Sequence, residues 1–85
     1  MKKEEVKLYS WIIRGSQRVK ILQAMEKPMT PTQIKRETKF ALNNVSDILR
    51  LFVKFKVAKC LNEKEKLGRL YELTEKGRRI KKLLS

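Results

Sequence analysis

The stretch that decides the fold is residues 30–54, TPTQIKRETKFALNNVSDILRLFVK. Its first four residues place a capping hydroxyl, a proline at the first helical position and a glutamine at the third, which is typical of a helix start. Further along, apolar side chains recur at spacings of three and four, as on a helix with one buried face. These are Val45, Ile48, Leu49 and Phe52. We therefore predict a short helix over 31–37, a tight connection over 38–41 and a longer helix over 42–54.

The flanking sequence predicts further helices and a hairpin. Residues 4–14 fit both a helix and a strand, with a helix favoured, and residues 17–26 have helical spacing. Residues 57–61 and 69–73 resemble two short strands joined by a long charged loop, and a last amphipathic helix follows over 75–84. In that last helix Ile80, Leu83 and Leu84 are expected to point inward.

A short helix, a tight turn and an amphipathic helix together form a helix-turn-helix, and a hairpin directly after them is a wing. We therefore expect a mostly helical α+β fold of the winged helix-turn-helix type, with a three-helix core, a hairpin wing, and additional N- and C-terminal helices. At 85 residues the chain has room for one such domain, over 1–85. A three-helix bundle with a hairpin that has no part in DNA binding is the simpler alternative.

Composition favours a nucleic-acid partner. The chain carries 22 Lys and Arg against 9 Asp and Glu, a formal net charge of +13. A domain this basic attracts polyanions, either nucleic acid or an acidic membrane surface. A solvated surface of mixed charge, as in heat-adapted proteins, is the alternative, but the basic excess is large and occurs in both halves of the chain.

The same composition argues against an enzyme, a cofactor or a metal site. There is no His, the only cysteine is Cys60, and no Ser or Cys has a plausible base nearby. One thiol leaves too few soft ligands for zinc, and no glycine-rich phosphate loop is present. No signal peptide or membrane span is recognisable, so we expect a cytoplasmic protein with no membrane partner. No small-molecule substrate is evident from the sequence either.

Four segments of the chain resemble a known family. They are PTQIK from Pro31, LNNVSDILRL from Leu42, CLN from Cys60 and GRLYELTEKG from Gly68. In this order they resemble the archaeal winged helix-turn-helix transcriptional regulators, relatives of the arsenic-repressor-like and MarR-like proteins. The resemblance covers about 11–84 and implies sequence-selective DNA binding, usually as a homodimer, with helix 42–54 in the groove.

Two positions depart from that family's pattern. Lys39 lies in the turn where the family often has Gly, so it must accept any positive φ that the turn demands. Ala41 lies where a capping Ser or Thr is common, and its side chain cannot accept a hydrogen bond from the helix N-terminus. Asp47 also puts a negative charge near the expected groove face, where it could accept from a cytosine amino group or pair with a neighbouring lysine.

We expect double-stranded DNA to be contacted from three elements. The recognition helix 42–54 would lie in the major groove, the wing 62–69 on the backbone or in the minor groove, and the preceding helix on the backbone. The contacting residues would be Asn43, Asn44, Ser46 and Arg50 on the recognition helix, Lys64, Lys66 and Arg69 on the wing, and Gln33, Lys35 and Arg36 on the preceding helix.

The terminal segments carry more apolar side chains than one small core needs. They are Val6, Tyr9, Trp11 and Ile13 near one end, and Ile80, Leu83 and Leu84 near the other. We therefore expect a homodimer formed through the terminal helices. The alternative function is a protein-interaction winged helix in a transcription or RNA-processing assembly, with Trp11 and the outer faces of the terminal helices as its working surface.

Overall fold

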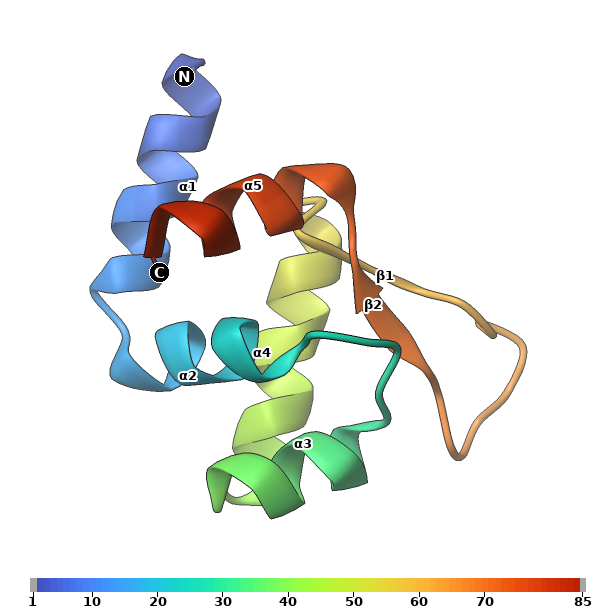
Figure 1. The fold of residues 1–85 in the computed structure, drawn as a ribbon. Coiled ribbons are helices and arrows are strands. Elements are labelled where there is room, and N and C mark those ends of the chain that lie inside the picture. The colour runs from blue at the N-terminus through green and yellow to red at the C-terminus, as the bar shows by residue number, and fades with distance from the viewer. Residues whose placement is uncertain (1, 85) are drawn as a thin grey trace.

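A computed structural model describes residues 2–84 of the chain. Within that range it contains five helices and one antiparallel two-stranded hairpin (Figure 1). The elements are α1 (Lys3–Ile13), α2 (Ser16–Ala24), α3 (Pro31–Thr38), α4 (Leu42–Lys54), β1 (Ala58–Cys60), β2 (Tyr71–Leu73) and α5 (Glu75–Leu84). The α+β class is confirmed, and the order of elements is consistent with a winged-helix layout.

The decisive stretch folds as predicted, for local reasons. Thr30 caps α3 through a capping box, since its Oγ1 accepts from the Gln33 amide at 3.2 Å and its own amide donates to Gln33 Oε1 at 2.8 Å. The turn after α3 places Lys39 at φ 67°, so this lysine does adopt the left-handed conformation. Ala41 precedes α4 without a side-chain cap, as its methyl group requires. α4 and α5 have the predicted bounds, whereas the bounds of the other helices and of both strands differ from the prediction by one or two residues.

α4 supplies the centre of the hydrophobic core. Its residues Val45, Leu49 and Phe52 are fully buried, and Ile48 is half-buried beside them. α2 packs against α1, α3 and α5, and contributes Ile21 and Leu22 to the same core. The remaining buried apolar residues are Leu8, Ile12, Met25, Met29, Ile34, Val57, Ala58, Tyr71, Leu73 and Ile80.

The hairpin is tied to the rest of the fold by a third extended segment. β1 pairs with β2 so that Ala58 faces Leu73 and Cys60 faces Tyr71. On the other edge of β2, Tyr71 exchanges two backbone hydrogen bonds with Met29, at 2.9 and 2.8 Å. Because Thr30 caps α3, this bridge fixes the hairpin directly beside the start of that helix.

α5 begins at a tight junction around the carbonyl group of Val57. That oxygen accepts from the Thr74 amide at 2.9 Å and from its hydroxyl at 3.1 Å, while Thr74 Oγ1 accepts from the Gly77 amide at 3.1 Å. Thr74 thus caps α5 as its position suggests. A Cβ on Gly77 would lie 2.1 Å from Val57 O, so the close approach of α5 to this backbone requires glycine.

The two terminal helices are joined by an ion pair. Arg79 of α5 donates to Glu5 of α1 at 2.7 Å, and this hydrogen bond holds the pKa of the Glu5 carboxyl below its ordinary value. A carboxyl group whose pKa is lowered by folding contributes stability at pH values above its unfolded pKa. That contribution is lost as the pH falls through its folded pKa.

The burial of α5 agrees only in part with the prediction. Ile80 is buried as expected, but Leu83 is not, since half of its surface is exposed.

We predict that Gly77→Ala destabilises the protein by about 1–3 kcal/mol or more, because overpacking against backbone cannot be relieved by a rotamer change. Gly15→Ala is the comparison and should cost less, since the atoms nearest to its added Cβ belong to the Arg18 side chain, which can shift at the expense of its contacts with Trp11, and not to backbone. Urea denaturation of both variants tests this. Equal stability of Gly77→Ala and the wild type would contradict the packing described for α5.

Candidate nucleic-acid interface

A groove between α3, α4 and the hairpin loop brings together residues from three separate parts of the sequence. Its volume is about 440 Å³. Ser46 and Arg50 line it from α4, and Lys66 and Arg69 line it from the loop. The other lining residues are Thr30, Pro31, Thr32, Leu42, Leu67, Gly68 and Tyr71. These lining residues include three cations and no carboxylate, so the groove attracts anions.

The direction of the buried stripe decides where the other predicted residues of α4 point. With Val45 and Leu49 inward, about 100° of rotation per residue turns Asn43 and Arg50 toward solvent. Asn44 falls on the flank away from the groove, where it lines a separate hollow with Arg14 and other residues of the α1–α2 connection. The structure therefore brings Ser46 and Arg50 to the groove and separates Asn44 from them.

Arg50 is held along the helix surface by an ion pair with Asp47, one turn earlier. Both side chains are largely exposed, at 73% and 62%. An exposed pair of this kind contributes little to stability, and an incoming phosphate or base can displace it. Asp47 therefore has an arginine partner, whereas the sequence suggested a lysine or a base.

The hairpin loop is organised by the side chain of Asn62. Its Oδ1 accepts from the Leu70 amide at 2.7 Å, and its Nδ2 donates to the Gly68 carbonyl at 3.2 Å. Gly68 has φ 67°, which a residue with a Cβ adopts only at a cost. Arg69 is anchored as well, because its Nε donates to Glu65 O at 2.7 Å. The loop thus presents its cations from a defined backbone.

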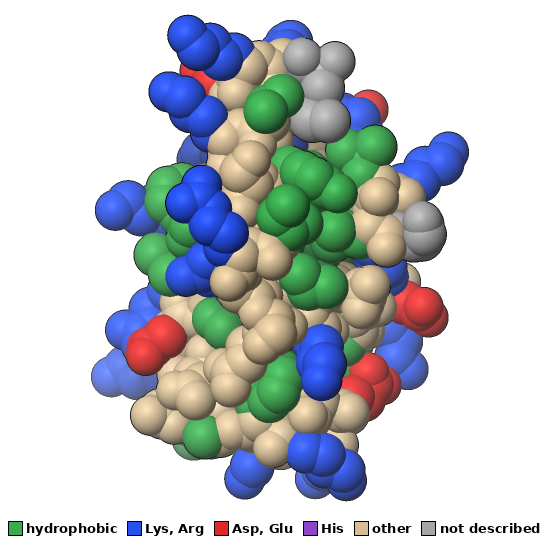
Figure 2. All heavy atoms as spheres, turned by 90° about the vertical axis from the view of Figure 1, so that its left-hand side faces the viewer, with side chains coloured by type: hydrophobic (Ala, Val, Ile, Leu, Met, Phe, Trp, Pro, Cys, Tyr) green, Lys and Arg blue, Asp and Glu red, His purple; other side chains and the backbone are tan. Residues whose placement is uncertain are grey.

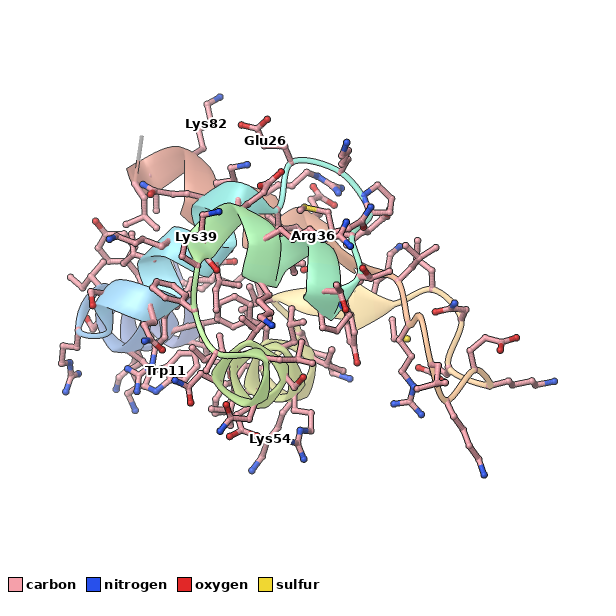
Figure 3. The ribbon with its side chains drawn as sticks, turned by 90° about the horizontal axis from the view of Figure 1, so that it is seen from below. Trp11, Glu26, Arg36, Lys39, Lys54 and Lys82 are labelled. Atoms are coloured by element: carbon pink, nitrogen blue, oxygen red, sulfur yellow. The ribbon has the colours of Figure 1, made fainter. Side chains whose placement is uncertain are left out.

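The other predicted cations are not among the residues that line this groove. Lys64 is exposed on the hairpin loop but does not line the groove, and Lys35 and Arg36 are exposed on α3. Figure 3 shows Arg36 and Lys39 on the α3 side of the molecule. Gln33 differs from the others, because its carbonyl oxygen is engaged in the α3 cap.

Sequence reasoning missed seven of the residues that line the groove, and Thr32 and Leu67 are the two most informative of them. Thr32 lies in the first turn of α3 and is exposed there. Leu67 is 89% exposed near the tip of the hairpin loop. The sequence did contain a signal for Leu67, because it is the one large apolar residue in the polar and charged loop 62–69. Thr32 has no comparable signal, because its direction depends on how α3 packs.

No protein-family model matches the chain, and no curated protein is significantly similar to it. Within residues 2–84 no three His, Cys, Asp or Glu side chains lie close enough together to hold a metal ion. In the same residues no helix has the length and apolar character needed to cross a membrane. The groove therefore has to be interpreted from its own chemistry.

We predict that Thr30→Ala lowers stability by about 1 kcal/mol, because the α3 amide that its hydroxyl satisfies loses its partner. Thr32→Ala is the control, since that threonine is exposed and takes no part in the cap. Thermal unfolding of both variants measures the difference. A larger loss for Thr32→Ala than for Thr30→Ala would show that the cap does not fix the start of α3.

Proposed function

We propose that this protein binds double-stranded DNA sequence-selectively as a transcriptional regulator of the winged helix-turn-helix type, acting in the cytoplasm. In this proposal α4 lies in the major groove and the hairpin loop 62–69 lies on the backbone or in the minor groove. The major groove of B-DNA is about 12 Å wide and accepts an α-helix. The observation that carries the proposal is the carboxylate-free groove in which Ser46, Arg50, Lys66 and Arg69 converge.

The positions of the side chains suggest distinct roles. Asn43 and Arg50 project from a rigid helix and carry groups that can donate to base edges, so we assign base reading to them. Lys66 and Arg69 supply charge next to that helix and would contact phosphates. Ser46, Lys64, Lys35 and Arg36 would add further backbone contacts, and Gln33 could add only its amide nitrogen. Asn44 would contact a phosphate on the far flank of α4.

We expect Lys66→Ala/Arg69→Ala to weaken binding to every duplex and to reduce the salt slope by about 0.9 log units per lost phosphate contact. Lys20→Ala is the control, because this exposed lysine on α2 is outside the groove. A fluorescence-anisotropy titration across a salt series measures the slope. An unchanged slope in the double variant would remove the hairpin loop from the interface.

We expect Asn43→Ala to reduce the preference for a selected site over random duplex, by about 1–3 kcal/mol if the lost contact is bidentate. Asn44→Ala is the matched control: it removes the same amide from the neighbouring position, which faces the other flank, and should leave that preference nearly intact. Competition between a selected and a random duplex measures both. An equal loss on both duplexes for Asn43→Ala would reduce the proposal to general DNA binding.

A homodimer is the second part of the proposal. Ile80 is buried, and Trp11 packs against the core, so neither belongs to the expected contact surface. What is exposed is Val6, Ile13 and Leu83, each near half of its surface. Figure 2 shows hydrophobic side chains gathered over this side of the molecule, where α1 and the end of α5 lie. A second copy related by a two-fold axis would cover this patch and separate two DNA half-sites by about 34 Å.

We predict that Val6→Asp/Leu83→Asp converts the dimer to a monomer, because it buries two charges in an apolar contact. Leu67→Asp is the control, since this exposed leucine lies on the distant hairpin loop. Light scattering gives the mass of each. A monomeric wild type at high protein concentration would contradict the dimer without touching the DNA-binding proposal.

A further inference from the structure

A second hollow lies between α1, the end of α4 and the start of α5, away from the proposed DNA groove. Its volume is about 530 Å³. The apolar residues that line it are Leu8, Trp11 and Phe55, and the charged ones are Glu4, Lys7, Lys54, Lys56 and Lys76. In Figure 3, Trp11 and Lys54 lie on the opposite side of the view from Arg36 and Lys39.

The aromatic side chains of the hollow are held in place by packing within the protein. The Trp11 ring meets Phe52 edge-on at 6.2 Å and Phe55 at 5.2 Å between ring centres. Arg18 holds the same tryptophan, because its guanidinium lies 4.4 Å from the ring centre and donates to Trp11 O at 2.7 Å. Phe55 nevertheless leaves 38% of its surface exposed. An apolar guest could therefore bury Phe55 without rearranging the core.

The rim of the hollow has a large excess of positive charge. Within the described residues, none of its four lysines has a carboxylate within ion-pair distance. Glu4 is the only acidic residue among those that line the hollow. The neighbouring Glu5 does not line it and is paired with Arg79. Four cations beside an apolar surface, with one anion, complement a ligand that is apolar at one end and negatively charged at the other.

We propose that this hollow binds a small organic anion, with its carboxylate among the lysines and its hydrocarbon body against Trp11 and Phe55. A volume of about 530 Å³ lies within the range of about 300–1,000 Å³ usual for small-molecule sites. A second copy of this chain is a poor occupant, because the exposed residues of the proposed dimer contact, Val6, Ile13 and Leu83, do not line this hollow. The face of α1 that carries Val6 and Ile13 is also turned by about 100–160° around the helix axis from Lys7 and Trp11.

The test uses 4-phenylbutyrate as the probe. Two comparison compounds each lack one of its features: its uncharged amide lacks the negative charge, and acetate lacks the aromatic ring. Trp11 is the only tryptophan in the chain and lines this hollow, so a change in its fluorescence reports binding there. Calorimetry measures affinity in parallel. Phenylbutyrate should bind saturably and change the Trp11 emission, the amide should bind at least about fivefold more weakly, and acetate should not change the emission.

Two sets of variants locate the site. Lys54→Gln/Lys76→Gln should weaken phenylbutyrate binding about five- to tenfold, whereas Lys3→Gln/Lys20→Gln, which removes the same charge elsewhere, should stay within about twofold. Phe55→Ala should also weaken binding, with far-UV circular dichroism as the check on its fold. Absence of saturable binding, equal affinity for the amide, or an equal effect of both lysine pairs would overturn the proposal. None of the residues substituted here is a proposed DNA contact, so this result is independent of the DNA titrations.

Discussion

The pair of backbone hydrogen bonds between Met29 and Tyr71 determines how the parts of this molecule are placed relative to one another. A hairpin of three-residue strands is marginal by itself, and its orientation would vary if only β1 supported β2. The Met29 bridge gives β2 a partner on its second edge. Because the next residue, Thr30, caps α3, a two-residue segment sets both the hairpin and the helix beside it. The groove between them depends on that shared anchor.

α4 then divides the surface into two regions of different chemistry. One side faces the hairpin loop and presents cations with hydroxyl groups, whereas its C-terminal end lies beside Trp11 and the lysine-rich rim of the second hollow. The Val57 junction lies just after this end and fixes where α5 starts. The Glu5–Arg79 pair continues the connection to α1. The two regions therefore share one rigid helix, and a ligand on either side contacts the same element.

Local signals in the sequence were sufficient for much of this fold. The α4 boundaries follow from an uninterrupted apolar stripe, the α3 start from its capping residues, and the conformation of Lys39 from the tightness of the turn. Non-local features were not predictable in this way. The Met29–Tyr71 bridge joins residues far apart in the chain, and nothing in the Met29 neighbourhood resembles a strand. The separation of Asn44 from Ser46 depends on which flank of α4 faces the hairpin, and the exposure of Leu83 depends on how α5 meets α1.

The two ends of α4 share a feature that bears on how this sequence can change. Lys39 before the helix and Lys56 after it both have left-handed backbone, at φ 67° and 65°. For a residue with a Cβ that conformation costs about 1–2 kcal/mol, which glycine would avoid. A search for more stable homologues or designed variants should therefore converge on glycine at both positions, at the expense of two charges. Persistence of lysine there across related genes would mean that selection has kept charge at the ends of this helix in preference to stability.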